Sequence, residues 1–184
     1  MKQVVRIIGG HYRGKKLYFP DIPNLRPTPS RVRETVFNWL MNDIHDKDCL
    51  DAYAGSGALG FEAFSRGAKT VSLVEQSPKA LASLKKNLQH FDQSGKKLQL
   101  YQMHCIQFLK TTSEMFDIIF LDPPFNSPLL LESVDIINQR HLLQDNGKLY
   151  IESPDEVFLP NEKWSKIKHK KSGHVNYALY KKAD

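Results

Sequence analysis

The sequence predicts an α/β protein built on a doubly wound, mainly parallel sheet. From residue 48 onward, apolar strand-like segments alternate with amphipathic helix-like segments, a pattern typical of βαβ units. A glycine-rich loop joins the first of these strands to the helix that follows. The apolar run Ile118–Leu121 lies between two aspartates, as expected for a strand covered on both faces.

The elements can be placed along a chain of 184 residues, an ordinary size for one domain. Residues 4–8 and 15–19 flank a glycine-rich segment and predict a β-hairpin. A proline-rich linker over 20–29 leads into a helix reaching about residue 44, with Thr28 or Ser30 as its N-cap. We expect residues 1–30 to form an N-terminal basic β-hairpin and linker, and residues 31–184 to form the α/β domain.

The βαβ region divides into regular segments. We expect strands at 48–52, 70–75, 98–102, 116–121 and 146–152, and helices at 58–65, 77–91, about 104–111 and 129–138. Residues 164–171 and 174–181 flank Ser172-Gly173 and predict an antiparallel hairpin that completes a seven-stranded sheet.

The charges are unevenly distributed along the chain. Residues 1–33 hold eight Lys or Arg and one acid, residues 163–184 hold seven and one, and the body between them has a net charge of −7. This asymmetry favours a polyanionic partner, with nucleic acid first, although basic tails without a partner are an alternative. The candidate RNA-binding residues lie in the hairpin and around the start of the first helix; they are Arg6, Arg13, Lys15, Lys16, Arg26, Arg31 and Arg33.

Several classes of protein are disfavoured. No apolar run approaches the roughly 18 residues of a membrane span, and the first residues lack the apolar core of a signal peptide. Cys49 and Cys105 have neither disulfide-framework nor metal-site spacing. We therefore expect a cytoplasmic protein with no metal and no membrane contact.

The glycine loop predicts a cofactor site. Residues 55–60 read G-x-G-x-x-G, and Glu75 closes the next strand, which indicates an adenosine-type cofactor with Glu75 on the ribose hydroxyls. Asp51 precedes the loop, and its carboxylate would repel a pyrophosphate bound there. S-adenosylmethionine instead carries an ammonium and a sulfonium, which a carboxylate attracts. The alternative is that Asp51 only caps the glycine loop.

The turn Asp122-Pro123-Pro124-Phe125 predicts the second half of a site. The prolines end the strand because they lack an N–H, which delivers Asp122 to the sheet edge where ligands of open α/β sheets bind. A carboxylate, rigid carbonyls and an aromatic ring suit a planar group with an N–H donor, such as a nucleobase amine. The first and fourth strands of a doubly wound sheet are neighbours, so both motifs should face one crevice.

These motifs, with Arg6-Ile7-Ile8-Gly9-Gly10, Arg26-Pro27-Thr28 and the segments 31–40 and 54–68, resemble the bacterial 16S ribosomal RNA guanine-N2 methyltransferases of the small subunit. The resemblance covers nearly the whole chain. It implies a Rossmann-like class I methyltransferase that moves a methyl group from S-adenosylmethionine to a guanine N2, in free 16S RNA or in a small-subunit particle. We expect the protein to be a monomer.

The resemblance also implies roles for individual residues. Asp122 and the Pro123 carbonyl would accept from the target amine, and Phe125 would stack on the base. Related enzymes often have an acid after the third strand that accepts from the adenine amine. Here that stretch is Met103-His104-Cys105-Ile106, so backbone groups of Cys105 or Ile106 would replace it. The cofactor residues are then Asp51, Tyr53, Ala54, Gly55, Ser56, Gly57, Glu75, Gln76, Cys105 and Ile106.

Three other functions fit parts of the sequence. An adenine-N6 methyltransferase on DNA or RNA would use the same crevice. A nicotinamide-dependent oxidoreductase would explain the glycine loop and Glu75, but it would not explain Asp51 or the turn at Asp122. A non-catalytic RNA-binding protein would leave that turn without a purpose.

Overall fold

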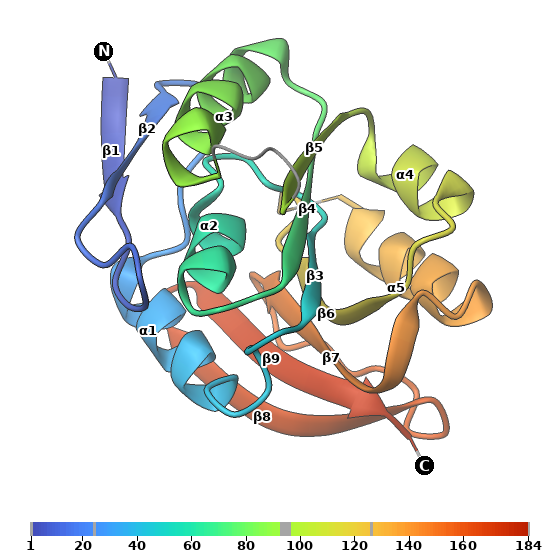
Figure 1. Cartoon of the computed structure of the whole chain (residues 1–184). Coiled ribbons are helices and arrows are strands. Elements are labelled where there is room, and N and C mark those ends of the chain that lie inside the picture. Colours follow the sequence, from blue (N-terminus) through green and yellow to red (C-terminus); the bar gives the residue numbers. More distant parts are fainter. Residues whose placement is uncertain (1, 24, 93–96, 126, 184) are drawn as a thin grey trace.

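A seven-stranded sheet lies at the centre of the computed structural model, which describes residues 2–23, 25–92, 97–125 and 127–183. Its strand order is β5-β4-β3-β6-β7-β9-β8 (Figure 1). The parallel strands are β3 (Asp48–Asp51), β4 (Thr70–Glu75), β5 (Leu98–Gln102), β6 (Phe116–Leu121) and β7 (Leu143–Ser153). The mainly parallel, doubly wound sheet predicted from the sequence is therefore confirmed.

The last two strands form the expected antiparallel hairpin. β9 (Val175–Lys182) pairs with both β7 and β8 (Trp164–Ser172) in antiparallel fashion. Ser153 pairs with Asn176, and Ser172 pairs with Val175. The turn between β8 and β9 consequently lies at the edge of the sheet where β7 ends.

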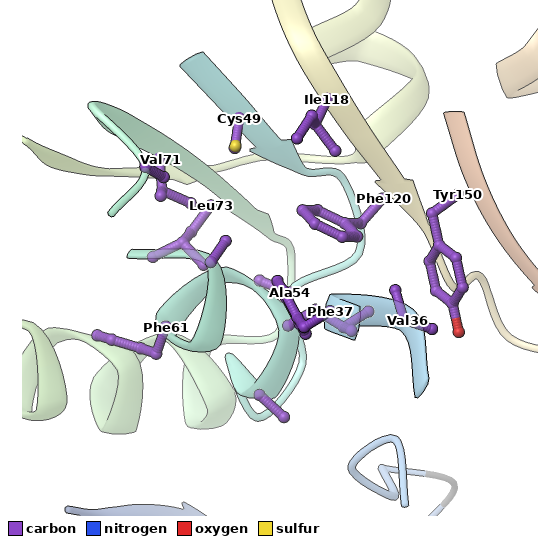
Figure 2. Close-up of a cluster of buried hydrophobic side chains, with 14 of the residues drawn as sticks. Val36, Phe37, Cys49, Ala54, Phe61, Val71, Leu73, Ile118, Phe120 and Tyr150 are labelled. Carbon is purple, nitrogen blue, oxygen red and sulfur yellow. The ribbon is translucent and has the colours of Figure 1, made fainter. Parts of the chain in front are cut away.

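Helices cover both faces of the sheet (Figure 1). α1 (Ser30–Trp39), α2 (Ala58–Ser65) and α3 (Pro78–Phe91) lie on one face, and α4 (Cys105–Thr111) and α5 (Leu129–Gln139) lie on the other. Each face has its own cluster of buried apolar side chains. Figure 2 shows the first cluster, in which Val36 and Phe37 of α1 lie beside Phe120 and Tyr150 of the sheet. α1 is thereby fixed over β6 and β7.

The N-terminal hairpin packs onto this same face. β1 (Lys2–Arg6) and β2 (Lys16–Pro20) form a separate two-stranded sheet. Its inward side chains Val5, Leu17 and Phe19 are buried in the first apolar cluster. The Asn87 side chain of α3 bonds both the N–H and the carbonyl of Tyr18. The extension is thus held by apolar packing as well as by hydrogen bonds.

A buried carboxylate ties the hairpin and α1 to α2. Glu62 accepts hydrogen bonds from the N–H groups of Ile8 and Gly9, both at 2.9 Å. It also pairs with Arg33 at 3.1 Å and with Arg66 at 2.8 Å. A buried charge is tolerated when it is paired and hydrogen-bonded, and Glu62 meets that condition at both oxygens.

The prediction that Arg33 contacts RNA is therefore wrong. Its side chain is fully buried, and it donates to Glu62 and to the backbone carbonyls of Thr28 and Arg6. Burial lowers the pKa of Arg33 from its ordinary value, while the Glu62 charge opposes that shift. Among the arginines near the start of α1, Arg33 is the buried one, and its partner Glu62 lies 29 residues further along the chain.

Some element boundaries differ from the sequence prediction. The N-cap of α1 is Pro29, with no side-chain cap, because Thr28 faces the sheet edge and Ser30 accepts from Arg33. The helix ends at Trp39, although Ile44 is still buried beyond it. β7 begins earlier than predicted, across a register shift opposite Phe116 and Ile118. Over the described residues, no helix is long and apolar enough to cross a membrane.

Replacing Glu62 with glutamine should lower the free energy of unfolding by about 3 kcal/mol, because it leaves Arg33 buried without a counter-charge. The control is Lys69→Gln, which removes an exposed partner of Asp48 and should change stability by less than about 1 kcal/mol. Urea denaturation measures both values. Equal effects of the two substitutions would contradict the structural role of Glu62.

Candidate active site

Four acidic side chains gather where the parallel strands end. Asp51 ends β3, Glu75 ends β4, Asp122 follows β6, and Glu152 is the penultimate residue of β7. β3 pairs with β6 over Cys49–Asp51 and Ile118–Phe120, so the glycine loop and the Asp122 turn leave the sheet side by side. The sequence predicted this meeting of two motifs that lie far apart along the chain.

The glycine loop keeps space open on one side and packs tightly on the other. Gly55 has φ +51°, and a Cβ built there would meet nothing closer than 3.8 Å. Gly57 has φ +80°, and its built Cβ would lie 2.6 Å from Phe61. Gly57 is also the N-cap of α2, with no side-chain cap. Gly55 therefore leaves room for a ligand at the backbone, while Gly57 lets α2 start against its neighbours.

Glu75 holds the loop to β4. One oxygen accepts from the Gly55 N–H at 2.8 Å, and the other accepts from the Ser77 N–H at 2.7 Å. The side chain is half-buried, so it faces both the loop and the open edge. A carboxylate has about four acceptor sites, which leaves capacity for further donors such as ribose hydroxyls.

Asp51 is buried beneath the same loop, with 2% of its surface exposed. Its Oδ2 accepts from the Gly60 N–H at 2.9 Å, which satisfies an otherwise unpaired donor in the first turn of α2. The capping role considered for Asp51 is thus present. Burial raises its pKa to about 7, with Glu75 and Glu152 adding to the shift.

The remaining predicted cofactor residues surround this loop unevenly. Ala54 and Ser56 are buried within it, Tyr53 is half-buried with its hydroxyl 2.8 Å from Ser133, and Gln76 is exposed. Cys105 and Ile106 begin α4 and are buried. The Ile106 N–H donates to the His104 ring, so its contact with an adenine would use another group. That contact stays a prediction.

Asp122 lies at the mouth of the crevice. It is half-buried, Pro123 is buried, and Phe125 is 41% exposed. Burial raises the pKa of Asp122 well above its ordinary value, and the charges of Glu152 and Asp51 raise it further. A hydrogen bond with the Thr28 side chain acts in the opposite direction. The linker therefore crosses the sheet edge and contacts the residue that the sequence singled out.

Glu152 and Thr28 are site residues that the sequence prediction missed. Glu152 is 3% exposed, accepts from the Tyr150 hydroxyl at 2.8 Å, and is hydrogen-bonded by Thr28. Burial raises its pKa to about 7. Among the described residues, no Lys or Arg contributes to the shifts of Asp51, Asp122 or Glu152. The sequence did contain one signal for Glu152, because it is an acid at the end of the predicted strand that follows the Asp122 turn.

A groove of about 450 Å³ opens next to these acids. Its lining includes the turn Pro123-Pro124-Phe125, Leu130 and Leu131 of α5, and the segment 152–158. Phe158 in this last segment is 76% exposed. A groove lined by aromatic rings and prolines, with a few polar groups among its lining residues, suits a planar ligand.

The predicted RNA-binding residues other than Arg33 remain on the surface. Arg6, Arg13, Lys16, Arg26 and Arg31 are exposed. Lys15 is half-buried, with its ammonium over the rings of Tyr12 and Phe91 and bonded to the His90 carbonyl. Tyr12 packs between Phe64 and Phe91, so it anchors the hairpin, whereas Tyr18 is 46% exposed.

Comparisons with known proteins agree with this architecture. The model of the family described as Conserved hypothetical protein 95 matches residues 5–181. The chain belongs to this family. A relative from Haemophilus influenzae, named Ribosomal RNA small subunit methyltransferase D, is 42% identical over 182 residues, which cover 97% of this chain and 94% of the relative. The protein of the same name from Escherichia coli K12 is 42% identical over 180 residues, covering 97% and 90%.

A solved structure of a similar protein has the same fold. The Escherichia coli protein yhhF superimposes with a TM-score of 0.87 at 40% identity, covering 98% of this chain and 99% of that one. The fold is that of the Rossmann-like methyltransferases, and the resemblance noted in the sequence is confirmed at the level of the family.

Stability should depend on pH through the buried acids of this family member. Glu152 has an ordinary pKa of 4.5 and a folded-state pKa of about 7. Between these values the folded protein holds a proton that the unfolded chain has released, so the free energy of unfolding falls as pH rises. Glu152→Gln should remove this contribution, which is worth at most about 3 kcal/mol at pH 8.

Urea denaturation between pH 4 and pH 8 measures this difference. The stability of the Gln variant relative to the native protein should rise with pH through that range. The exposed Glu132→Gln is the control and should show no such trend. Parallel pH profiles for the native protein and Glu152→Gln would contradict the raised pKa.

Proposed function

We propose that the protein transfers the methyl group of S-adenosylmethionine to the exocyclic N2 of a guanine in 16S ribosomal RNA. The observation that carries this proposal is the position of the Asp122 turn beside the glycine loop at one sheet edge. Relatives that are 42% identical and named Ribosomal RNA small subunit methyltransferase D support an RNA substrate of the small subunit. The choice of guanine N2 rests on the sequence resemblance.

The residues around the glycine loop fit S-adenosylmethionine. The open space at Gly55 admits a ligand close to the backbone, and Glu75 would accept hydrogen bonds from the ribose hydroxyls. The field of Asp51 and Glu75 favours a cationic ligand over a pyrophosphate. When bound, the cofactor supplies an electrophilic methyl group on a sulfonium.

Asp122 and Pro123 would orient the target amine. The lone pair of guanine N2 is delocalised into the ring, which makes the amine a weak nucleophile. Acceptance of its two protons by the Asp122 carboxylate and the Pro123 carbonyl would raise electron density on nitrogen, and Phe125 would hold the ring by stacking. Alignment of the amine with the methyl group supplies much of the rate. Because its pKa is raised, Asp122 is suited to receive the proton that N2 loses.

Basic groups on both sides of the crevice would hold the surrounding RNA. Arg26 of the linker and Arg31 in the first turn of α1 lie on either side of Thr28 in the sequence, and the hairpin adds Arg6, Arg13 and Lys16. The turn between β8 and β9 brings Lys170 and Lys171 to the edge where Glu152 lies. Phosphate contacts of this kind position a nucleic acid without reading its sequence. The target base must leave its stack to reach Asp122.

Asp122→Asn should reduce methyl transfer to RNA at least about 100-fold while S-adenosylmethionine still binds. Tritiated methyl transfer measures the first effect, and isothermal titration measures the second. Asp117→Asn is the matched control, because Asp117 lies at the opposite end of the same strand and pairs with Lys47. Undiminished turnover of Asp122→Asn would remove Asp122 from the reaction.

A triple substitution of Arg6, Arg13 and Lys16 by glutamine should weaken RNA binding about tenfold and flatten its dependence on salt. The charge-matched control replaces Lys69, Lys110 and Lys163, which are exposed elsewhere on the protein. Filter binding across a range of salt concentrations compares the two variants. An equal loss in both would show that the hairpin contributes only net charge.

A further inference from the structure

Glu152 has a position that the proposed chemistry does not yet use. Leu121 pairs with Ile151 in the parallel ladder of β6 and β7, so the next residues, Asp122 and Glu152, lie beside each other. Adjacent strands are about 4.8 Å apart, and paired residues project to the same face. After burial, the charge of Glu152 is the strongest influence on the raised pKa of Asp122. Two carboxyl groups are therefore presented together to whatever occupies the crevice.

The surroundings of Glu152 are unusual for a structural acid. It is almost fully buried, and its partners are the hydroxyls of Tyr150 and Thr28 rather than a cation. Glu62 shows the contrasting arrangement, in which two arginines and two backbone N–H groups neutralise a buried carboxylate. An acid kept in a buried site without a counter-charge is costly. Such an acid is a candidate for contact with a ligand.

Glu152 is also among the residues that line the groove beside the turn Pro123-Pro124-Phe125. A base stacked on Phe125 with its amine at Asp122 would turn one of the ring nitrogens beside that amine toward the adjacent strand, and an acceptor there favours the orientation in which this nitrogen carries a hydrogen. In guanine that nitrogen is N1, which carries a hydrogen next to the N2 amine. In adenine the ring nitrogen beside the N6 amine has a bare lone pair and faces a carboxylate unfavourably.

We propose that Glu152 selects guanine by accepting a hydrogen bond from its N1–H while Asp122 accepts from the N2 amine. This role rests on the proposed function. A site built to hydrogen-bond one substrate group rejects an analogue that lacks it, because the partner of that group is then left buried and unpaired. Thr28 and Tyr150 act as positioning residues, because their hydroxyls hold the carboxyl in place.

The test compares guanosine with 2-aminopurine riboside at the methylated position of a small-subunit RNA fragment. 2-Aminopurine keeps the amine but has an unprotonated N1. The native protein should prefer guanosine about 100-fold in kcat/KM. Glu152→Gln should narrow that preference to less than about tenfold, because its amide donates to a bare N1 as readily as its carbonyl accepts from N1–H. Glu132→Gln, an exposed substitution on α5, should leave the preference unchanged.

The outcomes separate this role from the proposed function. If the native protein methylates guanosine at N2 but uses 2-aminopurine equally well, Glu152 does not read N1, whether or not the variant folds. If the preference is large and persists in a folded Glu152→Gln, the selection comes from another group. If the native protein forms no N2-methylguanosine at all, the proposed function itself fails.

Discussion

The adjacency of β3 and β6 is the constraint on which the site depends. These strands are separated by two βα units in the chain, yet they hydrogen-bond at the centre of the sheet. Their carboxyl ends bring a glycine loop and a rigid proline turn to one edge. The same edge brings together Asp51, Asp122 and Glu152. Among the described residues, no Lys or Arg contributes to the pKa shifts of these three acids. A ligand with several hydrogen-bond donors would reduce the repulsion between these carboxyl groups.

A second buried carboxylate links the N-terminal hairpin to this edge. Glu62 binds the hairpin backbone and Arg33, and Arg33 binds the carbonyl of Thr28. The Thr28 side chain in turn contacts Asp122 and Glu152. The hairpin is therefore connected to the crevice through a continuous chain of hydrogen bonds. In the proposed function, this connection would hold RNA bound on the hairpin at a fixed position relative to Asp122.

Local sequence patterns were sufficient for the fold and for half of the site. Periodicity located the parallel strands, and glycine spacing and prolines located the two loops at the edge. Arg33 and Thr28 could not be placed, because their partners lie far away in sequence. The surrounding basic residues suggested an RNA contact for Arg33, and residue preferences at helix ends suggested an N-cap for Thr28. Glu152, like Asp122, is an acid at the carboxyl end of a parallel strand, but no proline directly after it showed where that strand ends. The positions and roles of such residues depend on contacts with residues far away in the sequence, which local composition does not reveal.

The central claim concerns the atom that receives the methyl group. The most direct measurement is mass spectrometry of nucleosides digested from unmethylated 16S RNA, or from small-subunit particles assembled on it, after incubation with the protein and labelled S-adenosylmethionine. The account predicts one labelled product, N2-methylguanosine, and its loss with Asp122→Asn. Labelled N6-methyladenosine, or no labelled nucleoside from either substrate, would contradict it.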